Sequence, residues 1–288
     1  NAYCRFNAID PSFIITPTGE HWLVYGSWHS GIAAIQLSPE TGKPLKDVGD
    51  PWNIGTGQTT NYGKPIATRD KSSRWQGSEG PEVIYNPETG YYYLFLAYDG
   101  LDVPYNTRVV RSKNIDGPYT GKNGTNVTTV GGDAFPVVTH PYAFESSVDN
   151  DGWVGISHCA VWDDGQGNWY FCSQGRKPVD YKDGEWAPNA IMMGHVRRIY
   201  WTSDGWPVVS PERYAGVEDA PVSTEDLEGT WELIDLTYSY GKQKTSTELT
   251  ITKSSVGTNR VTIKGTLTGS GVFDAEKNIL KVTVSVCS

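Results

Sequence analysis

The apolar positions of the chain fall into short runs that are separated by turn residues, and one arrangement of these runs occurs three times. A polar residue is followed by a short apolar run, a Gly-containing turn and an aromatic-rich second run, at residues 10–28, 79–97 and 158–173. Two β-prone runs on either side of such a turn predict a β-hairpin. The pattern therefore predicts three hairpins of one design.

The polar residues that begin these hairpins are Asp10, Glu79 and His158, and they lie several dozen residues apart. Repeats of this length made of short antiparallel strands are typical of β-propeller blades. In a propeller the innermost strands surround a central axis, so equivalent positions lie at the same end of that axis. We therefore expect these three side chains to converge in space.

The pattern changes in the last quarter of the chain. Residues 215–226 are polar and rich in turn formers, which predicts a linker. Residues 248–252 and 280–286 alternate apolar and polar positions, which predicts half-buried strands, and residues 231–236 predict another. We assign residues 1–214 to part of a β-propeller catalytic domain, 215–226 to a linker and 227–288 to a small β-sandwich or barrel domain.

Composition narrows the class of partner. The net charge is −9 and the basic residues form no stripe, so a nucleic-acid partner is not expected and a neutral polymer suits the acidic surface better than a polyanion. No apolar run approaches the roughly 20 residues of a membrane helix. The 11 Trp and 17 Tyr residues favour strands and sugar-binding surfaces.

The four cysteines form no CxxC pair, which gives a zinc or redox site little support. They are Cys4, Cys159, Cys172 and Cys287. If Trp162 pairs with Trp169 in the third hairpin, Cys159 faces Cys172. A cross-strand disulfide and two packed thiols are both open for that pair.

Two carboxylates that face one cavity are the minimal machinery of glycoside hydrolysis, and Asp10 and Glu79 are such a pair by position. The alternative is that each acidic residue caps a turn. His158 is either a hydrogen-bonded core histidine or a metal ligand. Trp28 either stacks on a sugar ring or packs in the core, and Arg176 pairs with an axial carboxylate or with a surface acid.

Several motifs resemble glycoside hydrolase family 43 arabinanases of the larger type that has a C-terminal domain. Asn7-Ala8-Ile9-Asp10-Pro11-Ser12 resembles their NAIDP motif, and Ser78-Glu79-Gly80-Pro81 resembles their general-acid motif. The stretches at 25–32, 152–159, 189–197 and 201–214 are similar to the same proteins, so the resemblance covers about residues 5–236.

The resemblance implies a secreted, extracellular enzyme with a five-bladed propeller that cleaves α-1,5-L-arabinan with inversion, as an endo-arabinanase (EC 3.2.1.99). Glu79 would be the general acid, and Asp10 would orient it and tune its pKa. His158 matches a histidine associated with a central calcium ion. The candidate substrate-binding residues are Asn7, Ser27, Trp28 and Arg176.

One departure concerns the general base, which in this family is an Asp well upstream of the NAIDP motif, whereas nine residues precede Asp10 here. By blade counting the chain supplies about three blades of five. We expect a separate N-terminal chain or fragment to complete the ring, and the chain alone to be inactive. The alternatives are an exo-acting arabinofuranosidase or β-xylosidase, and a non-catalytic carbohydrate-binding propeller.

Overall fold

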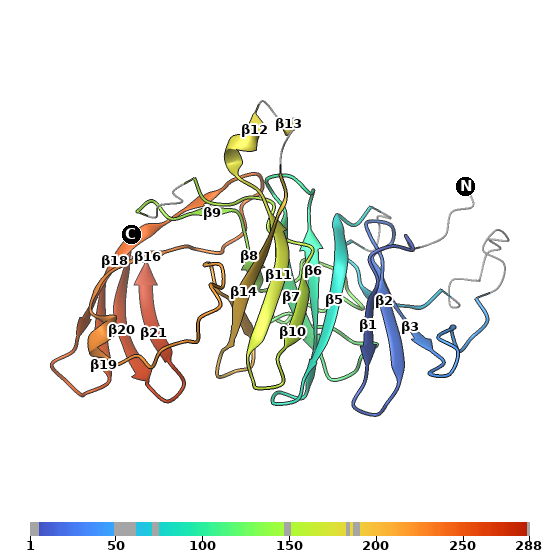
Figure 1. The fold of residues 1–288 in the computed structure, drawn as a ribbon, viewed down its shortest axis with the longest axis horizontal. Coiled ribbons are helices and arrows are strands. Elements are labelled where there is room, and N and C mark those ends of the chain that lie inside the picture. Colours follow the sequence, from blue (N-terminus) through green and yellow to red (C-terminus); the bar gives the residue numbers. More distant parts are fainter. Residues whose placement is uncertain are drawn as a thin grey trace.

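The computed structural model describes residues 6–48, 62–70, 75–146, 151–182, 185–186 and 191–286 (Figure 1). These residues form short strands and turns, with two 3-10 helices, η2 (Pro178–Asp180) and η3 (Glu225–Leu227), and no α-helix. Within the described ranges no helix has the length and apolar character needed to cross a membrane. The all-β class predicted from the sequence is confirmed.

Three four-stranded antiparallel sheets make up the larger part of the chain (Figure 1). The first sheet contains β1 (Ser12–Ile15), β2 (His21–Tyr25), β3 (Ile32–Leu37) and β4 (Lys64–Ala67). The second contains β5 (Ser78–Asn86), β6 (Tyr91–Tyr98), β7 (Asn106–Ser112) and β8 (Val137–Thr139). The third contains β10 (Ala160–Asp163), β11 (Trp169–Gly175), β14 (Met193–Trp201) and β15 (Pro207–Val209), and a small hairpin, β12 (Tyr181–Lys182) and β13 (Glu185–Trp186), leaves it between β11 and β14.

The three predicted hairpins are the first two strands of these three sheets, β1–β2, β5–β6 and β10–β11. Each sheet is an antiparallel meander in chain order. Short turns join the first strands of each sheet, and longer connections lead to β4, β8 and β14. The strand β5 contacts both β1 and β10. The leading strands of the three sheets therefore lie side by side, as the repeat predicted.

Two apolar cores join the sheets. The first lies between the first and second sheets and includes Val24, Ile66 and Leu94. The second lies between the second and third sheets and includes Phe95 and Phe171, both fully buried. Each large apolar side chain that is fully buried contributes about 1.5–3 kcal/mol to the stability of the fold. These two cores therefore hold the three sheets in their order.

One carboxylate links all three leading strands. The Glu82 side chain on β5 accepts a hydrogen bond from Ser12 Oγ of β1 at 2.8 Å and from the Val161 backbone N–H of β10 at 3.1 Å. Ser12 Oγ in turn accepts from the Val83 N–H at 3.1 Å. Burial raises the pKa of Glu82 above its ordinary value, although the hydrogen bonds from Val161 and Ser12 act in the opposite direction. The bonds cross from sheet to sheet and fix how β1 and β10 lie against β5.

The C-terminal part is a five-stranded antiparallel sheet of β16 (Gly229–Leu233), β18 (Thr247–Lys253), β19 (Arg260–Gly265), β20 (Leu267–Asp274) and β21 (Ile279–Val286). Its core includes Leu227, Ile251 and Phe273. The three strands predicted here are observed. The expected sandwich or barrel is not, because in the described residues β16 and β21 are the two unpaired edges of one open sheet.

The segment 234–246, which we call the strap, leaves the C-terminal sheet between β16 and β18 and docks on the larger part. Its strand β17 (Lys244–Thr245) pairs in parallel with β9 (Tyr142–Ala143). The backbone N–H of Ser239 donates to Nε2 of the buried His140 at 3.2 Å. The His140 Nδ1 lies 2.9 Å from the carbonyl oxygen of Pro141. A neutral ring with its proton on Nδ1 satisfies both contacts, because Nδ1 then donates and Nε2 accepts.

The predicted register of the third hairpin is wrong by one position. Trp162 pairs with Tyr170 rather than with Trp169, so Cys172 lies opposite Ala160. Cys159 precedes β10, and both thiols are free. The turn accounts for the shift, because the Asp164 carboxylate accepts from the Gln166 and Asn168 backbone N–H groups and lengthens the loop. Cys4 and Cys287 lie outside the described residues.

The Glu82 contacts predict a difference between two substitutions. Glu82→Ala leaves the Val161 N–H without its acceptor and should lower the free energy of unfolding by about 1–3 kcal/mol. Glu82→Gln keeps an acceptor oxygen and removes a charge that burial disfavours, so its stability at neutral pH should stay close to that of the parent. Urea denaturation followed by fluorescence measures both. Equal losses in the two variants would contradict the assigned contacts.

His140 predicts a pH dependence of stability. Burial lowers the pKa of His140 below its ordinary value. Between the ordinary value, about 6.5, and the lowered one, the unfolded chain binds a proton that the folded chain does not. The free energy of unfolding should therefore fall as the pH drops below about 6.5. Denaturation at a series of pH values checks this, with His140→Gln as the non-titrating control. The same slope in both proteins would exclude His140 as the source.

Candidate functional site

The Glu79 carboxylate lies at the start of β5 and is held by three donors from other segments. Its Oε2 accepts from Ser27 Oγ and from the indole Nε1 of Trp28, each at 3.0 Å. Its Oε1 accepts from the Tyr105 hydroxyl at 2.5 Å. Three convergent donors fix both oxygens of the carboxylate, so its orientation is set before any substrate arrives.

A β-bulge sets the direction in which the Glu79 side chain points. The register of β5 against β6 shifts between Glu79 and Glu82, where Gly80 and Pro81 intervene. Gly80 has a φ of +53°, a left-handed value that glycine adopts without a steric penalty. Bulges redirect side chains beside active sites. A regular strand would place Glu79 and Glu82 on opposite faces, whereas with the bulge both side chains reach neighbouring sheets.

Asp10 and His158 reach the same place from the first and third sheets. The Asp10 Oδ2 accepts from the Gly80 backbone N–H at 3.2 Å, and its Oδ1 lies 3.7 Å from His158 Nε2. The His158 Nδ1 lies 3.3 Å from the Tyr105 hydroxyl, which also bonds Glu79. The three side chains that begin the repeats are thus brought together, as the sequence predicted.

Backbone strain concentrates at the same residues. Asp10, Trp28 and His158 have φ values of 56°, 57° and 57°, in the left-handed region that non-glycine residues rarely occupy. Such conformations cost roughly 1–3 kcal/mol each and persist where the surroundings hold them, typically at functional sites. Three residues from three segments share this strain beside one carboxylate, which favours a functional site over ordinary turn caps.

Tyr105 is the residue that sequence reasoning missed. It is fully buried, it precedes β7 and it has no counterpart in the three-fold pattern, so no repeat position indicated it. Burial and the neighbouring Glu79 charge raise the pKa of Tyr105 far above its ordinary value. The hydroxyl therefore remains a donor at every relevant pH and bridges Glu79 to the His158 ring.

The other predicted site residues stand as follows. Ser27 is buried and Trp28 is partly exposed, and both contact Glu79. Asn7 is half-buried in the stretch that leads to Asp10. Arg176 is buried in the third sheet, where its backbone pairs with Val154 in the loop that leads to His158. Substrate contacts by these four residues stay a prediction.

The predicted calcium ion can be compared with the donors present. Calcium takes six to eight oxygen ligands, and a histidine is atypical among them. In the described ranges no group of three or more His, Cys, Asp or Glu side chains could hold a metal ion. A calcium ion beside His158 stays a prediction.

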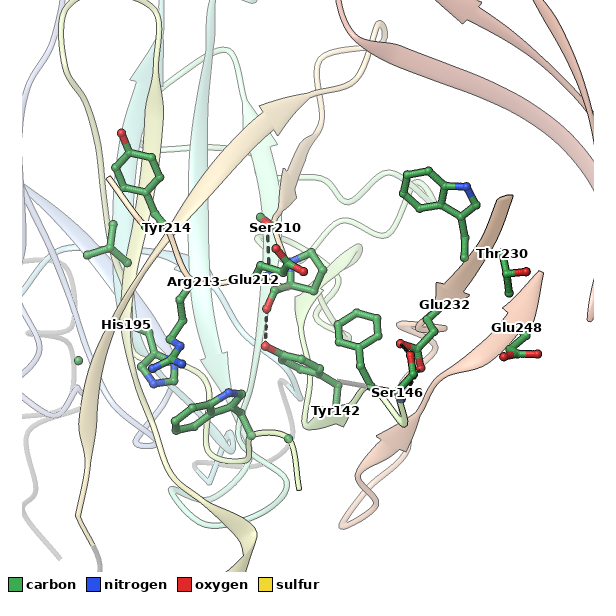
Figure 2. Close-up of a pocket in the computed structure, with 18 residues that line it drawn as sticks. Tyr142, Ser146, His195, Ser210, Glu212, Arg213, Tyr214, Thr230, Glu232 and Glu248 are labelled. Atoms are coloured by element: carbon green, nitrogen blue, oxygen red, sulfur yellow. Dashed lines mark hydrogen bonds between the residues drawn. The ribbon is translucent and has the colours of Figure 1, made fainter. Parts of the chain in front are cut away.

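A separate cleft lies between the third sheet and the C-terminal sheet (Figure 2). It encloses about 1400 Å³ and is lined from both sides, by Tyr142, His195 and Arg213 among others on one side and by Thr230, Glu232 and Glu248 on the other. Asp10, Glu79 and His158 are not part of its lining. The cleft is therefore distinct from the carboxylate site.

Comparison with known proteins places this geometry in a family. The family model for glycosyl hydrolases family 43 matches residues 2–207, which include the Glu79 site and the three sheets up to the first residue of β15. The chain belongs to glycosyl hydrolase family 43. A second family model, a C-terminal lipocalin-like domain found with family 43, matches residues 211–287.

Curated relatives of this family 43 chain are named as arabinanases. The extracellular endo-alpha-(1->5)-L-arabinanase 2 of Bacillus subtilis is 34% identical over 79% of this chain and 47% of its own length. A protein of the same activity name from Thermotoga petrophila is 31% identical over 83% of this chain and 48% of its own length. The chain thus spans about half the length of the curated relatives it matches.

Solved structures of family 43 members extend the likeness to the C-terminal part. The YxiA protein of Bacillus licheniformis aligns with 99% of this chain and 66% of its own, at a TM-score of 0.73 and 28% identity. The endo-1,5-alpha-L-arabinanase of Thermotoga petrophila aligns with 99% and 65%, at a TM-score of 0.73 and 25% identity. The larger part and the C-terminal sheet therefore occur together in both relatives.

The crowding at the bulge predicts a specific cost for a side chain at position 80. A Cβ on Gly80 would lie 2.9 Å from the His158 ring, whereas one on Gly19 would meet nothing within 4 Å. Both glycines have positive φ, so Gly80→Ala and Gly19→Ala share the left-handed penalty of roughly 1–2 kcal/mol. Only Gly80→Ala must also move His158, which should cost about 1–3 kcal/mol more.

Denaturant unfolding of the two glycine variants measures the difference directly. If Gly80→Ala and Gly19→Ala lower the free energy of unfolding by the same amount, the result would contradict the close packing of Gly80 on His158.

Proposed function

We propose that this chain supplies the general acid of an arabinan-cleaving, inverting glycoside hydrolase. The observation that carries the proposal is the Glu79 carboxylate, fixed by three donors at the point where the leading strands of three sheets meet. The family and the activity names of its relatives support an α-1,5-linked arabinofuranose polymer as the substrate. The endo mode in those names favours internal cleavage over removal of terminal residues.

In the reaction, Glu79 donates its proton to the glycosidic oxygen as the bond to the anomeric carbon breaks. Ser27, Trp28 and Tyr105 hold the side chain by donating to it, so they also accommodate the carboxylate that remains after transfer. Asp10 bonds the Gly80 N–H and thereby fixes the bulge that aims Glu79. We assign Asp10 the role of an orienting carboxylate.

Inversion requires a second carboxylate that activates water on the opposite face of the sugar, roughly 6.5–9.5 Å from the acid. Asp10 already bonds the backbone beside Glu79 and lies against His158, so we assign the base to an Asp on a segment that completes the propeller. In this proposal the three sheets are three of five blades. The exposed apolar side chains on the outer sheets support further packing, among them Phe13, Ile15, Trp162 and Val208.

The setting of the enzyme follows from the same relatives. Their names include the word extracellular, which supports secretion of this protein. A calcium ion near His158 would be held through bound water, with the imidazole positioning that water rather than entering the first ligand shell. The half-exposed Trp28 ring is the candidate platform for a sugar ring.

The acid role predicts the effect of Glu79→Gln in the protein that contains the complete propeller. The amide cannot donate a proton in the same way, so kcat on linear arabinan should fall about 10²–10⁴-fold. An arabinoside with a good aryl leaving group needs little protonation and should lose much less. Initial rates on the two substrates measure the contrast.

Glu88→Gln is the matched control, because Glu88 is exposed at the far end of the same hairpin and should keep full activity. Retention of most arabinan hydrolysis by Glu79→Gln would exclude the assignment. Arabinan binding without hydrolysis by the complete parent protein would indicate a carbohydrate-binding propeller instead.

A further inference from the structure

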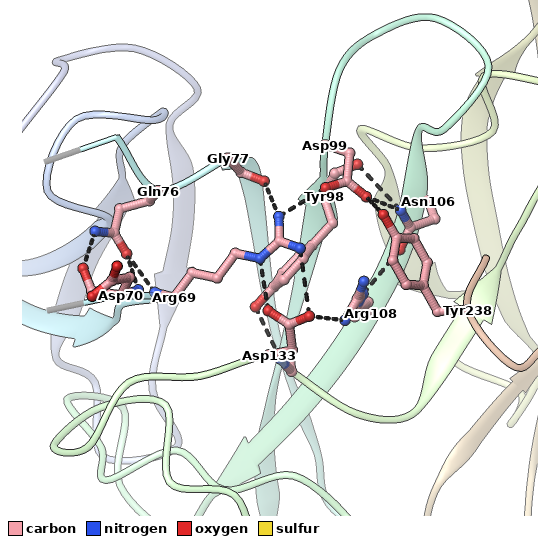
Figure 3. A network of polar contacts seen from close by, with 11 residues as sticks. Arg69, Asp70, Gln76, Gly77, Tyr98, Asp99, Asn106, Arg108, Asp133 and Tyr238 are labelled. Atoms are coloured by element: carbon pink, nitrogen blue, oxygen red, sulfur yellow. Dashed lines mark hydrogen bonds and ion pairs between the residues drawn. The ribbon is translucent and has the colours of Figure 1, made fainter. Parts of the chain in front are cut away.

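A polar network ties the C-terminal part to the segment that carries Glu79 (Figure 3). Its members come from four places: the residues that follow β4, the residues just before β5, the second sheet with its loops, and the strap. The buried carboxylate of Asp99, which is 8% exposed, lies at its centre. Asp99 follows β6 and has a φ of 70°, so its backbone is also held in the left-handed region.

Both oxygens of Asp99 are engaged. Oδ1 accepts from Arg69 Nη1 at 2.8 Å. Oδ2 accepts from Asn106 Nδ2 at 3.0 Å and from the Tyr238 hydroxyl at 2.5 Å. Tyr238 belongs to the strap, so one of the three donors to this buried carboxylate comes from the C-terminal part.

Tyr238 is fixed in place by more than its hydroxyl. Its ring lies 4.3 Å from the Arg108 guanidinium, a cation–π arrangement, and contacts His140 edge-on. Arg108 is 3% exposed and forms an ion pair with Asp133 at 2.9 Å. Burial and the Asp99 carboxylate raise the pKa of Tyr238, so its hydroxyl remains protonated and continues to donate.

The network reaches Glu79 through the backbone. The Asp99 N–H donates to the Gly77 carbonyl at 2.9 Å, and Arg69 Nη1 donates to the same oxygen at 3.1 Å. Gly77 is two residues before Glu79. On the other side, the Trp28 N–H donates to the Ser78 carbonyl at 2.9 Å, and Trp28 is itself a donor to the Glu79 carboxylate.

We propose that Tyr238 is a positioning residue, through which the C-terminal part holds the start of β5 and so sets the aim of Glu79. The proposal rests on the acid role given to Glu79 above. Without the Tyr238 hydroxyl, the buried Asp99 carboxylate loses one of its three donors, and the contacts of Asp99 and Arg69 with the Gly77 carbonyl loosen. The C-terminal part then contributes to catalysis without contacting the substrate.

Tyr238→Phe tests this in the protein with the complete propeller, because it keeps the ring on Arg108 and removes only the hydroxyl. Misplacement of a catalytic group by a fraction of an ångström lowers kcat, and we expect a loss of about tenfold with KM changed less than about twofold. Tyr240→Phe, on the exposed neighbour in the strap, is the matched control and should behave as the parent.

Hydrogen exchange separates this proposal from the acid assignment. In Tyr238→Phe, amide exchange in residues 76–80 should be faster by about threefold or more, with exchange in the C-terminal sheet unchanged, whether or not arabinan is the substrate. If the parent protein fails to cleave arabinan, the proposed function fails while this readout still decides the positioning role. Exchange in residues 76–80 and a kcat both identical to the parent would overturn the proposal, as would a loss of activity that only follows a lowered melting temperature.

Discussion

The contact between the leading strands of three sheets is the constraint on which the rest of the structure depends. Apolar side chains pack the sheets against one another, but apolar packing alone leaves their relative height poorly defined. The Glu82 bonds to Ser12 and to the Val161 N–H are directional and set that height. Once β1, β5 and β10 are in register, Asp10, Glu79 and His158 must meet, because each lies at the same end of its strand.

Because of the bulge at Gly80, the single strand β5 carries both the inter-sheet contact of Glu82 and the carboxylate of Glu79. Glu82 faces the neighbouring sheets and bonds them, while Glu79 is directed to donors from the first and second sheets. A regular strand would place residues 79 and 82 on opposite faces at a fixed spacing. The one extra residue in β5 changes that alternation, and the Gly80 N–H donates to Asp10, which stabilises the irregular backbone. The site and the inter-sheet bonds are therefore built from the same few residues.

Much of this arrangement could be predicted from the sequence, and the parts that could not share a physical cause. The hairpins follow from local apolar runs and turns, and the convergence of Asp10, Glu79 and His158 follows from their repeat. Tyr105 and the strap have no local signature, because their contacts join segments far apart in the chain. The register at Cys172 depended on hydrogen bonds by one Asp164 side chain, and a one-residue error exchanges the faces of a strand. The C-terminal sheet was predicted to be part of a sandwich or barrel because alternation marks a half-buried strand without saying what covers it.

The strap changes how the C-terminal sheet is understood. A domain that only added a binding surface would need no buried contact with the catalytic part. Here Ser239 bonds the buried His140, and Tyr238 completes the donors of the buried Asp99. Without the strap, Nε2 of the buried His140 would lose its donor and Asp99 would keep two of its three donors, and a buried polar atom is costly to leave unpaired. The two parts are therefore joined by buried hydrogen bonds, and the link between them ends at Gly77, two residues from Glu79.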